Sequence, residues 1–182
     1  MVLAMLWAKS IGNEMKLLKQ LLGNEMKLLK QLLENTNPQF LQTREEIEEW
    51  LQKYGIKNYI IRDDLMVNVD GDVILSYKKL SFIPVKFWEV AGEVNCSNNQ
   101  LTSLKGAPRE VGGDFNCSNN QLTSLKGAPK EVGRDFWCSY NQLTSLDGAP
   151  RAVGGNFNCI NNQLTSLDGI GNVTGEIISD LK

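Results

Sequence analysis

The chain has 182 residues, of which 42% are hydrophobic and 22% charged, and its formal net charge is −2. This balance does not favour nucleic acid as a partner, and no stretch reaches the roughly 18 apolar residues of a membrane span. The first residues lack the charged start and the cleavage site of a signal peptide. We therefore expect a cytoplasmic protein with no membrane span and no nucleic-acid partner.

Residues 1–37 are predicted to form a helical N-terminal extension. The 11-residue phrase GNEMKLLKQLL occurs twice there without a difference, at 12–22 and 23–33. Eleven residues are close to three helical turns, so one continuous helix would carry an apolar stripe that packs against this chain or a second copy. Two alternatives stay open. Gly23–Asn24 ends one helix and begins the next, or the stripe with its lysines lies on a membrane surface.

Residues 38–71 are predicted to form an N-terminal cap that contains one helix and one or two strands. Thr43 followed by Glu46 has the pattern of a capping box, and Gly55 is expected to end the helix. The strands that follow would turn at Asp63–Asp64. Because the terminal core of a repeat stack must be covered, we expect this helix to close the open end of the first coil.

A unit of 21 residues repeats four times from Glu93 to Glu176, and a divergent copy from Asp72 to Gly92 precedes it. A fixed period of this length indicates stacked identical coils. The Phe-x-Cys segment reads as a short strand, and the Gly-Ala-Pro segment predicts an extended or polyproline-like return arm. The predicted fold is an α+β repeat protein, with a solenoid of five 21-residue registers and parallel strands over residues 72–182.

Two columns of repeated residues are expected to hold the coils together. Cysteines that stack in line, in a chain without histidine, are expected to be buried small hydrophobes, neither metal ligands nor disulfide partners. The asparagine three residues after each cysteine is expected to bond the backbone of its own and the neighbouring coil. The cysteine column is Cys96, Cys117, Cys138 and Cys159, and the asparagine column is Asn99, Asn120, Asn141 and Asn162.

The phrase NNQLTSL with a period near 20 residues resembles the short leucine-rich repeats of bacterial effector proteins. The segment MKLLKQLLENTNPQFLQTREEIEEWLQKYGI, followed by repeats of the type CSNNQLTSLKGAPKEVGG, resembles a group of leucine-rich-repeat-like proteins from large tailed phages. This resemblance covers roughly residues 26–182 and brings no catalytic motif. It implies a leucine-rich-repeat-like solenoid and a phage factor that binds and modulates a host protein, including a defence component.

Catalysis is not expected. Without histidine no Cys–His or Ser–His pair can be built, and the chain has no phosphate-binding glycine loop and no spaced metal ligands. We predict that the protein is not an enzyme and carries no cofactor. A column of acids leaves a metal-dependent enzyme as an alternative, although each carboxylate is rather expected to bond the amides of the preceding glycine turn. These acids are Asp72, Glu93, Asp114 and Asp135.

Partner-binding residues are expected where the copies differ. Trp137 and Tyr140 replace asparagines in the third copy, and Ile160 replaces a serine in the fourth. Ile74 and Tyr77 occupy the same strand in the divergent copy. Large exposed side chains on a polar surface are what an interaction hot spot requires, whereas sequence drift or packing against the N-terminal helix is the alternative. We therefore predict non-catalytic interaction with a protein partner.

The end of the chain carries a second candidate surface. Ile177 and Ile178 are predicted to begin one more strand at an uncovered edge. Such an edge favours pairing with a second copy, so we expect a homo-oligomer through this edge or through the N-terminal helix. A self-assembling structural repeat protein is accordingly the alternative function.

Overall fold

The computed structural model describes residues 20, 22–25 and 40–181. The chain divides into two units, Met1–Gln39 and Phe40–Lys182. In the first unit, residues 20 and 22–25 are helical. Gly23 and Asn24 therefore lie within a helix, and the alternative in which they separate two helices is wrong. The other predictions for the extension fall outside the described residues.

The second unit begins with helix α2 (Arg44–Lys53). Thr43 Oγ1 accepts a hydrogen bond from Glu46 N at 3.2 Å, and the Glu46 carboxylate accepts one from Thr43 N at 3.1 Å. The predicted capping box is confirmed. Beyond the helix, Gly55 has a φ of 70°, which suits a glycine at a helix end. Two side chains of α2 are buried in the same hydrophobic cluster as the coils, those of Ile47 and Leu51.

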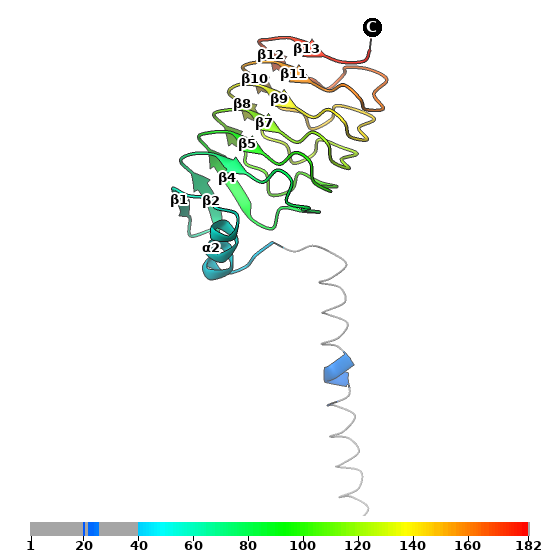
Figure 1. The fold of residues 1–182 in the computed structure, drawn as a ribbon. Coiled ribbons are helices and arrows are strands. Elements are labelled where there is room, and N and C mark those ends of the chain that lie inside the picture. The colour runs from blue at the N-terminus through cyan, green and yellow to red at the C-terminus, as the bar shows by residue number, and fades with distance from the viewer. Residues whose placement is uncertain (1–19, 21, 26–39, 182) are drawn as a thin grey trace, which may run out of the picture. The chain divides into compact units, whose positions relative to one another are not determined.

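The coils form two sheets, which Figure 1 shows stacked from the α2 end to the C-terminus. The seven-stranded sheet contains β1 (Tyr59–Ile61), β2 (Met66–Val69), β4 (Lys86–Val90), β6 (Glu110–Val111), β8 (Glu131–Val132), β10 (Ala152–Val153) and β12 (Asn172–Val173). The six-stranded sheet contains β3 (Val73–Ile74), β5 (Val94–Asn95), β7 (Phe115–Asn116), β9 (Phe136–Trp137), β11 (Phe157–Asn158) and β13 (Ile177–Ile178). All neighbouring strands are parallel except β1 and β2, which form an antiparallel hairpin with its turn at Asp63–Asp64.

The return arm of each coil is extended, as predicted, and it contains a short parallel strand, β6 in the second coil. Pro108 cannot donate a hydrogen bond, but the residues after it can, and Arg109 N donates to Trp88 O at 2.8 Å. Because buried backbone groups need partners, adjacent arms pair with each other and form the second sheet.

Strand pairing defines the length of each copy. Val73 pairs with Val94, 21 residues further on, which confirms the divergent first register. Phe157 pairs with Ile177, however, only 20 residues further on. The last copy has therefore lost one residue, and the predicted 21-residue period fails there. Since Ala152 pairs with Asn172, the loss lies before β12.

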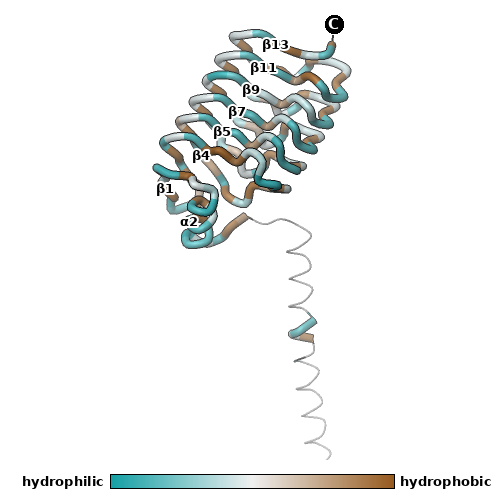
Figure 2. Tube along the Cα trace, viewed as in Figure 1, coloured by the Kyte–Doolittle hydropathy of each residue, from teal (hydrophilic) through white to brown (hydrophobic). Residues whose placement is uncertain are grey.

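The core lies between the two sheets and repeats from coil to coil, as the alternation of hydrophobic and hydrophilic stretches in Figure 2 shows. Phe115, Phe136 and Phe157 are fully buried and stack with centroid separations of 5.5 and 5.0 Å. The paired leucines of the second, third and fourth coils are also fully buried. Among the described residues, no helix has the length and hydropathy that crossing a membrane requires.

Candidate interaction surface

The asparagine column fixes the turn after each strand of the six-stranded sheet. Asn141 Nδ2 donates to the carbonyls of Cys117 (3.1 Å), Cys138 (3.1 Å) and Ser139 (3.2 Å). Its Oδ1 accepts from Leu122 N of the preceding coil at 3.0 Å. The expected bonds to both coils are therefore present. Equivalent bonds are made by Asn99, Asn120 and Asn162.

The cysteine column is buried and contains free thiols. Burial raises the pKa of Cys96 to about 12 and that of Cys159 to about 11. Burial also raises the pKa values of Cys117 and Cys138 well above the usual 9.0. Because the thiolate is the reactive form, these groups are poor nucleophiles, and their packing is that of small hydrophobes.

Trp137 and Tyr140, which we call the Trp137 surface, lie on the exposed side of the six-stranded sheet. Their side chains are 41% and 52% exposed. Trp137 O accepts from Cys117 N at 2.8 Å, so the backbone is engaged in the sheet while the indole remains at the surface. The paired positions in the neighbouring strands are asparagines, Asn116 and Asn158.

Tyr140 also has a backbone conformation that its residue type disfavours. Its φ is 53°, in the left-handed region, which asparagine tolerates and bulky residues avoid at a cost of roughly 1 kcal/mol. Tyr77 has a φ of 57° at the equivalent position. Exposed aromatic residues that are held in a strained conformation are candidates for function. The other coils place asparagine in this column, namely Asn98, Asn119 and Asn161.

Ile74 and Tyr77 form a second exposed pair on the same face. Ile74 is 43% exposed and Tyr77 is 75% exposed. The pairing of successive strands places Ile74 three coils from Trp137 in one column. At a strand spacing of about 4.8 Å, the two pairs lie about 14 Å apart, with asparagines between them. One partner could therefore contact both pairs.

Ile160, the remaining predicted partner-binding residue, is less exposed than these four residues. It continues the column of Ser97, Ser118 and Ser139, which are buried, and it is itself partly buried. Ser139 Oγ donates to Ser118 Oγ at 3.0 Å within that column. The replacement of serine by isoleucine adds a partly exposed apolar side chain there, and its contact with a partner stays a prediction.

The C-terminal coil leaves part of the core exposed. Ile177 and Ile178 form β13 and are both exposed, and Figure 2 shows a hydrophobic stretch there. Leu164 and Leu167 in the coil beneath are only partly buried, although the leucines at these positions in earlier coils are fully buried. The predicted self-association residues thus lie beside an incompletely covered end of the core.

The three aspartates of the acidic column join neighbouring coils through the backbone, whereas the Glu93 carboxylate accepts a hydrogen bond from Asn95 Nδ2 at 3.1 Å. Asp135 Oδ1 accepts from Asn156 N at 2.7 Å, and Asn156 Oδ1 accepts from Glu176 N at 2.8 Å. Asp72 and Asp114 accept equivalent bonds. The expected bonds to the preceding glycine turn are replaced by bonds to the next coil, because stacking places the next strand-entry amide beside each carboxylate. In the described part of the chain, no group of three or more His, Cys, Asp or Glu residues could hold a metal ion.

One group of surface residues lies outside the sequence prediction. Trp88 on β4 has the guanidinium groups of Arg62 and Arg109 over its ring. The available signal was the replacement of Gly-Ala-Pro-Arg by the sequence Val-Lys-Phe-Trp at 85–88 in the divergent copy. That signal identifies Trp88, whereas Arg62 comes from a hairpin outside the repeats.

In comparisons with known proteins, no family model matches the chain, and no curated protein or solved structure matches it.

Proposed function

We propose that the protein is a non-catalytic recognition module that binds a partner protein through the Trp137 surface. The observation that carries this proposal is Tyr140, an exposed tyrosine at a φ of 53° in a position where three of the other four coils have asparagine. Aromatic residues that a partner buries at the centre of an interface contribute about 2 kcal/mol or more each. The exposed pair of Ile74 and Tyr77 extends the same face.

The proposal includes the leucine-rich-repeat-like character of the solenoid and a capping role for α2. The leucine and asparagine columns support the first, and burial of Ile47 and Leu51 against the coils supports the second. On the resemblance of residues 26–182 to phage proteins, we further propose a phage factor in the bacterial cytoplasm. Its partner would then be a host protein, including a defence component.

Self-assembly is the second candidate function, and the exposed Ile177 and Ile178 favour it. Partial exposure of the core in the last coil provides an apolar surface that a second copy could cover. Sedimentation over a range of concentrations tests this alternative. A monomer at every concentration would exclude it.

The test of recognition uses variants that restore the repeat consensus. Trp137→Asn with Tyr140→Asn introduces the residues found at these positions in neighbouring coils, so the fold is expected to be retained. Asn116→Ala with Asn119→Ala is the matched control one coil away. Capture from bacterial lysate should yield proteins that bind the natural chain and the control but not the consensus variant. Equal capture by all three would contradict the proposal.

A further inference from the structure

The first coil departs from the repeat on the seven-stranded sheet. The next three coils turn there through Gly-Ala-Pro, whereas the first coil continues as the five-residue strand β4. Val67 of β2 pairs with Phe87, but Asn68 pairs with Glu89, so Trp88 is the extra residue of a β-bulge. Bulges redirect a side chain and occur frequently beside functional sites. This bulge places Trp88 at the position where the following three coils have arginine or lysine.

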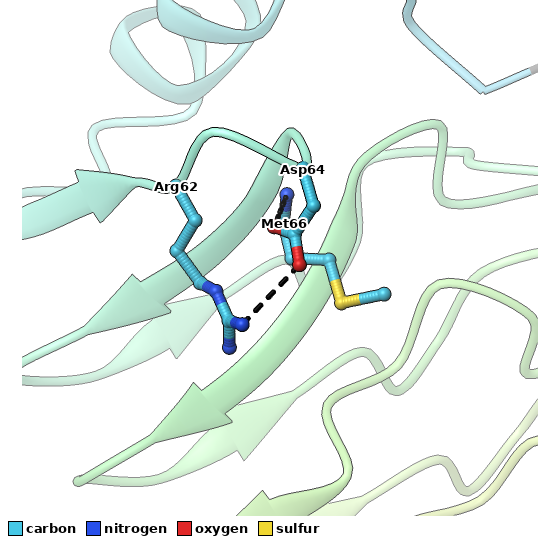
Figure 3. A network of polar contacts seen from close by, with 3 residues as sticks. All are labelled: Arg62, Asp64 and Met66. Atoms are coloured by element: carbon cyan, nitrogen blue, oxygen red, sulfur yellow. Dashed lines mark hydrogen bonds and ion pairs between the residues drawn. The ribbon is translucent and has the colours of Figure 1, made fainter.

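Trp88 is held by two cations. The Cζ atoms of Arg62 and Arg109 lie 4.9 and 5.1 Å from its ring centroid. Arg62 follows β1 and Arg109 precedes β6, so the two approach from elements on opposite sides of β4. Figure 3 shows how Arg62 is positioned, with Nη2 3.2 Å from the Asp64 carboxylate, which also accepts from Met66 N. Arg109 is likewise ion-paired, with its Nε 3.5 Å from the Glu110 carboxylate, so the ring and its guanidinium groups form a wall in which each cation is partnered by an acid.

A groove of about 310 Å³ lies beside this wall. Its apolar surface includes Phe40 and Trp88, and no carboxylate lines it. Lys105 and Lys130 are exposed and form no ion pair with any described residue. The cations that line the groove are Lys86, Lys105, Arg109 and Lys130.

We propose that this groove binds an acidic protein segment in which an aromatic or apolar side chain lies between carboxylates. Arg109 is ion-paired with Glu110 at 3.5 Å, so the charge complementarity comes from three lysines that form no ion pair with any described residue, Lys86, Lys105 and Lys130. The volume is at the lower limit of ligand pockets and suits one or two side chains. Single-stranded nucleic acid is disfavoured because guanidinium groups already lie over the ring on which a base would stack. The groove is on the seven-stranded sheet and is independent of the Trp137 surface.

The repeat provides a matched test. Lys105→Glu with Lys130→Glu reverses two groove charges. The control is Lys126→Glu with Arg151→Glu, which makes the same charge change one coil further along, outside the groove. The probe is a fluorescein-labelled peptide with one phenylalanine flanked by two glutamates on each side, followed by fluorescence anisotropy. The groove variant should weaken binding at least tenfold, and the control should change it less than twofold.

Two further probes separate the causes of binding. A peptide with glutamine in place of glutamate should bind at least tenfold more weakly, and so should a single-stranded oligothymidylate. Equal melting temperatures of the two double variants would establish that both are folded. The proposal is overturned if the acidic peptide shows no saturable binding up to about 1 mM, if both double variants lose affinity equally, or if oligothymidylate binds more tightly than the peptide.

Discussion

Replacement of Asn141 by alanine should strongly destabilise the stack. The side chain is buried and makes four hydrogen bonds that join two coils. Each of the three carbonyls keeps a second donor, namely Asn119 N on Ser139 O at 3.0 Å, Asn120 Nδ2 on Cys117 O at 3.1 Å and Asn162 Nδ2 on Cys138 O at 3.1 Å. The loss therefore falls mainly on Leu122 N–H, whose acceptor is the Asn141 side chain.

The magnitude follows from this unpaired group. A buried polar group that loses its partner costs about 1–3 kcal/mol, and each of the three carbonyls loses one of its two hydrogen bonds as well. We therefore expect Asn141→Ala to lower the free energy of unfolding by about 2 kcal/mol. Since domains of this size are stable by about 5–15 kcal/mol, the change should be large in any equilibrium measurement.

Equilibrium unfolding in urea, followed by tryptophan fluorescence, measures this change. Gln142→Ala is the control, because Gln142 is adjacent and exposed while its backbone N–H still donates to Leu122 O at 2.8 Å. The control should stay within about 0.5 kcal/mol of the natural chain. A loss below about 1 kcal/mol for Asn141→Ala, or an equal loss in both variants, would refute the role of the asparagine column.

Three other predictions concern single columns. Tyr140→Asn should raise the free energy of unfolding by about 0.5–1 kcal/mol by relieving the positive φ, and a decrease in thermal or urea melts would mean that the tyrosine stabilises the fold. Native thiols should not react with a thiol reagent at pH 8. The folded pKa of Cys96 is about 12, so the contribution of its neutral thiol to the free energy of unfolding is complete below about pH 9 and is lost as the pH rises toward 12. A Cys96→Ala variant should lose less stability over the same pH range. Asp135→Asn should leave the free energy of unfolding nearly unchanged because Asn156 already makes the same bond, whereas Asp135→Ala should lower it by about 1 kcal/mol. A rise in melting temperature with divalent ions would instead support the metal-dependent enzyme.

Identical residues at a fixed interval made much of the fold predictable. A residue that recurs every 21 positions occupies the same place in each coil, so the bonds of Asn141 and the burial of the cysteines follow from the period. The extended return arms were predicted, but their pairing into a second sheet was missed because two-residue strands such as β6 have no alternating pattern. The loss of one residue before β12 was missed because Gly169 still falls on the 21-residue period.

The candidate sites were less predictable. Trp137 and Tyr140 stand out as exceptions to the repeat, but the strain at Tyr140 depends on a φ angle that spacing alone does not reveal. The lower exposure of Ile160 was not predictable from the replacement of a serine, because the repeat does not reveal that the serine column is buried. The cations around Trp88 come from a hairpin and a later coil, so only the folded chain brings them together.

The most direct test of the proposed function is the affinity of a captured partner for the natural chain and for the variant with Trp137→Asn and Tyr140→Asn, measured by titration calorimetry. Two buried aromatic anchors of about 2 kcal/mol each predict a loss of at least 100-fold, even if their effects are not fully additive. The variant should be at least as stable as the natural chain. Unchanged affinity in a folded variant would contradict recognition through the Trp137 surface.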